Sequence, residues 1–150
     1  MTESTISKAE WQVMRVIWAN PNTTSNFIIE VLTKKYAWKT STIKTLITRL
    51  QKTNCIAIAN TKRPYQYIAL ISEHDHLTQE MDYLFDNICA NKKEQLLGEF
   101  IEKRPFTKRQ LAYLQTILDA KKQTAVEHLD CGCPPGQCSC RCKITESEEK

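Results

Sequence analysis

The sequence predicts a mainly α-helical protein with three parts: a head in which helices precede a small β-hairpin, a helical region, and a cysteine-rich C-terminal tail. Apolar residues recur at helical spacing through most of residues 8–122. Two short runs rich in β-forming residues, 56–58 and 65–70, interrupt that periodicity. Five of the seven cysteines lie within residues 131–142, where the apolar pattern has faded. These three observations set the order of the parts.

The first two helices are marked by their ends. Ser7 and Glu10 have the spacing of a capping box, in which the two side chains satisfy amides left free at a helix start. Pro21 ends this helix, because proline disfavours helical geometry in the residue before it. Thr24 or Ser25 is then placed to cap a second helix.

A third helix is predicted to begin at Thr40 or Ser41, and it is strongly amphipathic. Its apolar residues repeat at i, i+3, i+4 and i+7: Ile43, Leu46, Ile47 and Leu50. The polar residues between them fall largely on the other faces. The exposed side of this helix therefore offers hydroxyls and cations at helical spacing.

The two β-forming runs are separated by residues 60–64, which include Lys62 and Arg63. This pattern predicts a β-hairpin with a basic tip. Three helices followed by such a hairpin make a winged helix-turn-helix with a small β-hairpin wing. We place this domain at residues 5–71.

Residues 72–123 are predicted to be a helical dimerisation region. Ser72 and Asp75 begin it as a capping box, and Thr107 caps its last helix. Three apolar stripes follow in order: Leu77, Met81, Leu84, Phe85 and Ile88; Leu96, Leu97, Phe100 and Ile101; Leu111, Leu114, Ile117 and Leu118. Three short helices in roughly 50 residues make a marginal core, which favours a homodimer. The alternative is that the stripes pack only on one another within one chain.

The net charge of +4 conceals a strongly basic segment. Residues 31–72 hold eight lysines and arginines and no Asp or Glu. A polyanion is therefore expected to bind this part of the chain, although the same residues can also serve only as a solvated surface. We predict that the third helix reads base edges in the major groove of double-stranded DNA.

The predicted DNA contacts divide between the third helix and the hairpin. Lys44 and Arg49 can bind guanine edges or phosphates, and the threonines can bind phosphates or touch thymine methyl groups. The hairpin cations contribute affinity and salt dependence more than specificity. The full set is Ser41, Thr42, Lys44, Thr45, Thr48, Arg49, Lys52, Lys62 and Arg63. Simple solvent exposure is the alternative for each of them.

The tail, residues 124–150, is predicted to bind a thiophilic metal. Its pattern is C-x-C-x4-C-x-C, formed by Cys131, Cys133, Cys138 and Cys140, with Cys142 as a candidate extra ligand. Four thiolates can close a tetrahedral shell on Zn(II), whereas soft Cu(I) also prefers thiolates and forms clusters with bridging sulfurs. The spacing is tighter than the C-x2-C pairs usual in zinc fingers and favours Cu(I). A thiol–disulfide switch and a tail without a ligand are the alternatives.

The remaining cysteines and the histidines carry weaker signals. Cys55 and Cys89 lie in apolar patterns and are expected to be core residues. His74 and His76 stand at a helix start and are expected to be solvated or to cap it. His128 lies three residues before the cysteine pattern and is a minor candidate ligand.

Other classes of protein are disfavoured by what the chain contains. No apolar run approaches the roughly 18 residues of a membrane span, and the N-terminus lacks the features of a signal peptide. A cytoplasmic protein without membrane contact is expected, and there cysteines indicate metal or thiol chemistry rather than disulfides. Three glycines, three histidines and no phosphate-binding loop speak against an enzyme.

Several stretches resemble the BlaI/MecI family of winged-helix repressors. They are ISKAEWQVM at 6–14, IW at 17–18, TSN at 24–26 and above all TLITRL at 45–50, and the likeness runs from residue 6 to residue 122. With the C-x-C-x4-C-x-C tail added, the chain resembles the CopY-type copper-responsive branch of that family.

The resemblance implies a function and a direction of switching. A homodimer is expected to hold an inverted repeat of the TACA-x-x-TGTA kind, ahead of copper-transport genes, in its apo or Zn(II) form. Occupation of the tail by Cu(I), for which a copper chaperone is an expected donor, then releases the DNA. The alternatives are a β-lactam-type repressor inactivated by proteolysis and a copper buffer or chaperone.

Two residues depart from the β-lactam-responsive members of the family. Glu99-Phe100 stands where those members carry an Asn-Phe bond for regulatory cleavage, which disfavours a proteolytic switch. Ser41 stands where a lysine is common, so the base preference of those members is not carried over to that contact.

Overall fold

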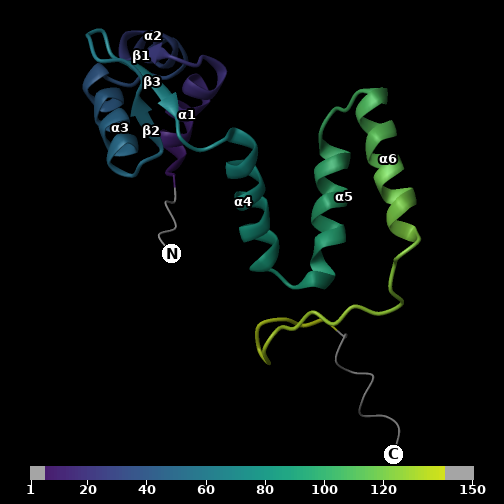
Figure 1. Ribbon diagram of the computed structural model, residues 1–150. Helices are drawn as coiled ribbons and strands as arrows, with labels where there is room; N and C mark the ends of the chain where they lie inside the picture. The colour runs from purple at the N-terminus through teal and green to yellow at the C-terminus, as the bar shows by residue number, and fades with distance from the viewer. Residues whose placement is uncertain (1–5, 141–150) are drawn as a thin grey trace, which may run out of the picture. The chain divides into compact units, whose positions relative to one another are not determined.

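The computed structural model describes residues 6–140, which fall into two compact units, one ending at Gln79 and the other beginning at Glu80. The first unit contains α1 (Lys8–Ala19), β1 (Thr23–Thr24), α2 (Ser25–Lys35), α3 (Thr40–Lys52), β2 (Ile56–Ile58) and β3 (Gln66–Ala69) (Figure 1). α4 (Glu73–Asp86) crosses the boundary. The second unit continues with the 3₁₀ turn η1 (Ala90–Lys92), α5 (Lys93–Lys103) and α6 (Lys108–Lys122). The fold is mainly α-helical, as the sequence predicts.

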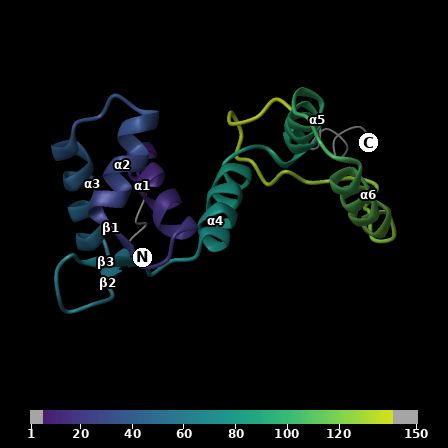
Figure 2. The same ribbon diagram turned by 90° about the horizontal axis from the view of Figure 1, so that it is seen from above.

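The first unit is a winged helix-turn-helix. β2 and β3 form the predicted hairpin, with Ile56 opposite Ala69 and Ile58 opposite Tyr67. β3 lies in the middle of a three-stranded antiparallel sheet, because β1 pairs with its other edge. Figure 1 shows the hairpin between α1 and α3, and in Figure 2 the strands lie at one end of the three helices.

The core of this unit is built from the apolar faces of the three helices and the inner side of the sheet. Its largest fully buried side chains are Val13, Met14, Ile17, Ile28, Ile43, Leu50, Cys55 and Ile56. The position of Cys55 confirms its assignment to the core. The apolar positions of the third helix are all buried, which also confirms the rotation predicted for it.

The helix starts in this unit follow the predicted capping chemistry. The Ser7 Oγ accepts the Glu10 N–H at 3.1 Å, and the Glu10 carboxylate accepts the Ser7 N–H at 3.0 Å. The Thr24 Oγ1 accepts the Phe27 N–H and so caps α2. α3 begins at Thr40, and Lys39 precedes it without a side-chain cap. These caps fix where α1 and α2 begin relative to the core.

The end of α3 is set by a residue whose role the sequence did not reveal. Asn54 has a φ of +59°, in the left-handed region that few residues other than glycine and asparagine adopt readily. The N–H of Asn54 donates to the Gln51 carbonyl, and the N–H of Cys55 donates to the Leu50 carbonyl at 2.9 Å. This pair of bonds is a Schellman motif, and it turns the chain from α3 directly into β2.

Two short elements were not predicted. β1 contains only Thr23 and Thr24, which is too short for an alternating pattern, and its pairing with β3 depends on a strand more than forty residues away. η1 is a single 3₁₀ turn between α4 and α5. Neither element has a periodicity that a sequence can display.

The expectation that His76 is solvated or caps a helix is wrong. His76 is only 5% exposed, and its ring lies 4.8 Å from the Trp11 ring and 5.7 Å from the Trp18 ring. The Trp18 indole N–H donates to the Ile71 carbonyl at 2.9 Å. Two tryptophans on α1 therefore draw the first turns of α4 onto the head. Ser72 does cap that helix, because its Oγ accepts the Asp75 N–H.

The second unit exposes most of its large apolar side chains. Within the described residues, α5 and α6 contain no buried residue. The exposed apolar side chains of these two helices include Leu96, Leu97, Phe100, Ile101, Leu111, Ile117 and Leu118. The alternative in which the stripes bury one another within one chain is therefore wrong for this structure. These faces need some other partner to leave water.

None of the helices in the part of the chain from 6 to 140 combines the length and hydropathy needed to cross a lipid bilayer.

We expect Leu50→Ala to destabilise the head by roughly 2–5 kcal/mol, because a fully buried side chain is lost and the core collapses only partly. Urea unfolding followed by circular dichroism measures the loss. Thr48→Ala, an exposed change on the same helix, is the control and is expected to alter stability by less than about 0.5 kcal/mol. Equal effects of the two changes would contradict the rotation of α3 described above.

Candidate DNA-binding face and metal centre

The outward face of α3 is set by its buried face. Ile43, Leu46, Ile47 and Leu50 are 5% exposed or less. With this stripe held in the core, the polar residues of α3 face solvent. All seven predicted α3 contacts are exposed: Ser41, Thr42, Lys44, Thr45, Thr48, Arg49 and Lys52. Their arrangement is what a helix in a major groove requires, and their contacts with DNA stay predictions.

Two threonines on this face use their hydroxyl protons within the helix. The Thr45 Oγ1 donates to the Ser41 carbonyl at 2.9 Å, and the Thr48 Oγ1 donates to the Lys44 carbonyl at 3.0 Å. In these rotamers the hydroxyls are not available as donors to phosphate. These bonds disfavour the predicted phosphate contact, and contact between the methyl groups and thymine stays a prediction.

The wing is organised by Asn60, a residue that sequence reasoning did not single out. Its side-chain amide N–H group donates to the carbonyls of Lys62 at 2.8 Å and Pro64 at 3.0 Å, and its Oδ1 accepts the Gln66 N–H. These bonds close the loop over its own backbone and leave Lys62 and Arg63 exposed at the tip. The only sequence signal was the general preference of asparagine for turns.

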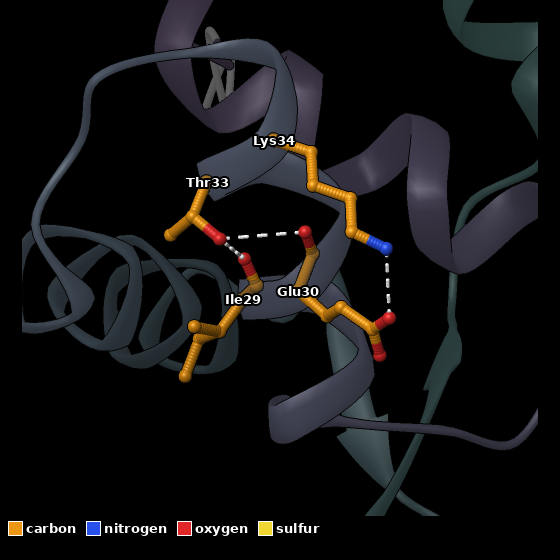
Figure 3. A network of polar contacts seen from close by, with 4 residues as sticks. All are labelled: Ile29, Glu30, Thr33 and Lys34. Carbon is orange, nitrogen blue, oxygen red and sulfur yellow. Dashed lines mark hydrogen bonds and ion pairs between the residues drawn. The ribbon is translucent and has the colours of Figure 1, made fainter.

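The cations of the basic segment do not all have the same environment. Figure 3 shows Lys34 on α2, whose ammonium lies 2.9 Å from the Glu30 carboxylate one turn earlier. The Thr33 hydroxyl in the same figure donates to the Ile29 carbonyl at 2.7 Å. Within residues 6–140 no carboxylate lies within 4.0 Å of the cationic groups of Lys44 or Arg49. The charge of the α3 face is therefore available to an external anion.

The four cysteines of the C-x-C-x4-C-x-C pattern lie together, as predicted. The Cys131 Sγ is 3.6 Å from the Cys138 Sγ and 3.4 Å from the Cys140 Sγ, and the Cys138 and Cys140 Sγ atoms are 3.4 Å apart. Cys133 lies in the same group. Each of these four residues is half-buried.

The chain forms a turn between the two cysteine pairs. Gly136 has a φ of +93°, and the Gln137 N–H donates to the Pro134 carbonyl. Gly132 has a φ of +64°, and its N–H donates to the Asp130 carboxylate at 2.9 Å. Both glycines occupy conformations that other residues adopt only with strain. This backbone brings the two C-x-C arms face to face.

The expectation that Cys89 is an ordinary core residue is wrong. Cys89 is buried, but it lies outside the hydrophobic core cluster of the described residues. Its Sγ belongs to a group with the Sγ atoms of Cys131, Cys133 and Cys138, all within 4.8 Å of one another. Sequence reasoning missed this because Cys89 is far from the tail in the chain and sits at the end of an apolar stripe.

The crowding of these thiols disfavours their ionisation. The thiol of Cys140 is the main cause of the raised pKa of Cys138, followed by the thiol of Cys131. At Cys89 the backbone N–H of Asn91 lowers the pKa, but burial and the tail thiols outweigh it and the pKa is raised overall. Thiolates packed this closely need a cation among them to remain ionised together.

The donor set fits a thiophilic metal. Four thiolates around a tetrahedral Zn(II) lie about 3.8 Å from one another, given a Zn–S bond of about 2.3 Å. The Sγ separations of 3.4–3.6 Å are slightly closer than this, and the wider group lies within 4.8 Å. Small shifts suffice for such a site. The same sulfurs suit Cu(I), which accepts lower coordination numbers and shared thiolates.

Two of the remaining candidates do not join this group among the described residues. His128 is exposed and is not one of the residues gathered around the sulfurs. Cys142 lies outside the described residues.

The chain is similar in sequence to several known proteins. The sequence model of the penicillinase repressor family matches residues 6–120. The methicillin resistance regulatory protein MecI of Staphylococcus aureus is 32% identical over 116 residues, which cover 77% of this chain and 94% of MecI. The "Uncharacterized 16.5 kDa protein in ptsI 3'region" of Latilactobacillus sakei is 35% identical over 142 residues, or 93% of this chain and 97% of that protein.

Solved structures of a repressor match about half of this chain. The solution structure of the DNA binding domain of the repressor BlaI has 35% sequence identity and a TM-score of 0.44, and the match covers 47% of this chain and 87% of that domain. The Bacillus licheniformis BlaI monomeric form in complex with the blaP half-operator has 36% identity and a TM-score of 0.42, covering 47% and 85%. The family match ends before Cys131, so the four tail cysteines of the thiol cluster lie beyond the matched residues, whereas Cys89 lies within them.

We expect Lys44→Ala and Arg49→Ala each to weaken binding to a duplex with a TACA-x-x-TGTA inverted repeat by roughly 5- to 150-fold, as for the loss of a base or phosphate contact. Fluorescence anisotropy at fixed salt measures the loss. Lys34→Ala is the matched control, because Glu30 already neutralises that lysine, and it is expected to change affinity by less than about twofold. An equal loss of affinity in all three variants would show that α3 contributes only net positive charge and makes no specific contact with DNA.

Proposed function

This chain belongs to the penicillinase repressor family, and we propose that within this family it is a copper-responsive transcriptional repressor of copper-transport genes. The observation that carries the proposal is a cluster of cysteine thiols, most of which belong to a tail that lies beyond the residues matched by the family. None of the relatives named above is described in terms of copper, so the metal specificity is argued from the thiols. Its homologues are DNA-binding repressors rather than enzymes.

The winged-helix head supplies the DNA-binding half of this function. The exposed cations and threonine methyl groups of α3 suit base edges in a major groove, and the wing cations suit the flanking phosphates. We assign residues 5–71 to this role, with contacts from Ser41, Thr42, Lys44, Thr45, Thr48, Arg49, Lys52, Lys62 and Arg63. The family matches and the free charge on α3 support this assignment.

The helical region, residues 72–123, is assigned to homodimer formation. Its exposed leucines, isoleucines and phenylalanines would aggregate a monomer, whereas a second copy offers the same faces for burial. A twofold dimer presents two α3 helices related by symmetry and therefore reads an inverted repeat. An operator with two half-sites suits this arrangement.

The tail, residues 124–150, is assigned to metal sensing. Bound metal supplies the positive charge that stabilises closely spaced thiolates, and Cu(I) and Zn(II) both accept such ligands. The protein is proposed to hold its operator in the apo or Zn(II) form and to release it when Cys131, Cys133, Cys138 and Cys140 take up Cu(I). The C-x-C spacing is tighter than the C-x2-C pairs usual in zinc fingers, which favours Cu(I).

A second candidate is a β-lactam-type repressor inactivated by proteolysis, which the likeness to methicillin resistance regulators favours. The peptide bond between Glu99 and Phe100 lies inside α5, whose hydrogen-bonded backbone resists a protease that needs an extended strand. This function also leaves the thiol cluster without a role. Cleavage of the protein in derepressed cells would support it, and intact full-length protein would exclude it.

We expect a titration of the operator complex to separate these functions. DNA affinity is expected to be retained with Zn(II) and to fall at least about tenfold with Cu(I), a loss of roughly 1.4 kcal/mol. Fluorescence anisotropy under anaerobic, reducing conditions measures both. The variant with serine at 131, 133, 138 and 140 is expected to bind DNA like the wild type and to ignore Cu(I). Normal release by this variant would show that the tail is not the sensor.

We expect Leu97→Glu with Leu118→Glu to convert a dimer into a monomer, because two charges per chain would have to be buried in the interface. Sedimentation velocity measures the change. The matched control is Gln95→Glu with Gln115→Glu, which adds the same charges at exposed polar positions of α5 and α6. If both double variants remain dimers, the dimer interface does not include the surface around Leu97 and Leu118.

A further inference from the structure

Cys89 stands apart from the tail in the sequence but not in the fold. It follows α4 and immediately precedes η1, and the chain from η1 through α6 separates it from Cys131. Even so, its Sγ lies within 4.8 Å of the Sγ atoms of Cys131, Cys133 and Cys138. Its side chain is 5% exposed, and in the described residues its thiol neighbours are those of the tail. The sulfur thus faces the cluster rather than an apolar core.

We propose that Cys89 is a ligand of the metal centre, so that metal binding closes the tail onto the segment between α4 and α5. This inference rests on the proposed function only in taking the tail as a metal site. It adds a ligand that the C-x-C-x4-C-x-C pattern does not contain. Cys89, Cys131, Cys133 and Cys138 supply the four sulfurs of a tetrahedral set, and Cys140, 3.4 Å from two of them, provides a fifth sulfur for a bridged cluster.

The backbone around Cys89 is suited to hold a ligand in place. The Cys89 carbonyl accepts the Lys92 N–H at 2.9 Å, which closes the turn of η1. Cys89 itself is the N-cap of that turn, with φ −59° and ψ 130°. A thiol on a hydrogen-bonded turn loses less conformational freedom on binding a metal than a thiol on an irregular loop.

A neighbouring residue ties the tail to the same place. The Asn91 side-chain amide donates to the Leu129 carbonyl at 3.2 Å and to the Cys140 Sγ at 3.8 Å. The first bond fixes the backbone just before the cysteine pattern, and the second orients one of its sulfurs. The Cys89 thiol and the Asn91 amide therefore both contact the tail from the same turn.

Because of the position of Cys89, metal binding would also constrain the predicted dimerisation region. α5 and α6 both lie between Cys89 and Cys131 in the chain. A metal bridge between these residues closes that stretch into a loop and restricts its ends. The loop contains α5 and α6, whose apolar faces are exposed. A change in the number of sulfurs bound to the metal would then change the spacing of α5 and α6, the helices assigned to homodimer formation.

We expect bound metal to protect Cys89 from alkylation in the intact, full-length protein. Iodoacetamide labelling, read by mass spectrometry of peptides, compares the apo protein with protein loaded with Zn(II) alone or Cu(I) alone. Labelling of Cys89 is expected to slow at least about tenfold with metal, in step with Cys131 and Cys133, because a metal-bound thiolate is not a free nucleophile. Cys55, buried in the head, is the internal reference and is expected not to respond to metal.

A substitution tests the same ligand by affinity. Cys89→Ser is expected to lower Zn(II) affinity at least about tenfold in competition with a chelator, and Cys89→His to recover part of it, since imidazole also binds zinc. Ala90→Ser is the matched control and is expected to leave affinity unchanged. The labelling experiment uses the wild-type chain, so it still tests the role of Cys89 if a variant misfolds.

The outcomes separate this inference from the proposed function. Labelling of Cys89 at an unchanged rate, with the tail cysteines protected, would overturn the role of Cys89 and leave the tail site intact. Labelling of all these cysteines at unchanged rates would overturn the metal centre and with it the proposed function. If metal protects Cys89 but Cu(I) still releases DNA normally from Cys89→Ser, Cys89 is a ligand. Closure of the stretch between Cys89 and Cys131 is then not needed for DNA release.

Discussion

The burial of four side chains on α3 is the constraint on which the DNA-binding face depends. Ile43, Leu46, Ile47 and Leu50 fill the space between α1, α2 and the sheet. Successive residues of an α-helix are rotated by about 100°, so a shift of one position would expose this stripe and bury charged residues. The core therefore decides which side chains face outward. The caps on α1 and α2 and the left-handed Asn54 after α3 hold the helix ends to the same register.

The second unit obeys a different physical condition, because its helices do not bury one another. α5 and α6 keep their apolar faces exposed in the described structure. The cysteine cluster combines Cys89, which precedes α5 in the chain, with cysteines that follow α6. In the proposed function such a region would gain stability from a second chain and from a metal rather than from its own core. A part of the molecule that is only completed by partners is suited to respond to them.

The sequence allowed much of the fold to be predicted, since the signals were local. Capping boxes at Ser7 and Thr107, the stripe on α3 and the hairpin runs all depend on residues within one or two turns of one another. The C-x-C arms and the glycine turn between them are local in the same way. His76 and Cys89 were misplaced because their surroundings are non-local: tryptophans on α1 surround the first, and the tail surrounds the second. Asn60 was missed since its role in the wing depends on how the loop closes.

The sequence by itself determined the helices, the wing, the basic segment and the thiol-rich tail, because periodicity, turn chemistry and ligand spacing are written within short stretches of chain. Only the tertiary structure decided that β1 completes the sheet, that the hydroxyls of Thr45 and Thr48 turn back to their own helix, and that a buried cysteine after α4 shares the site of the tail. Each of these depends on which distant segments meet. That pairing is set by the summed burial and hydrogen bonding of the whole fold, which no local pattern contains.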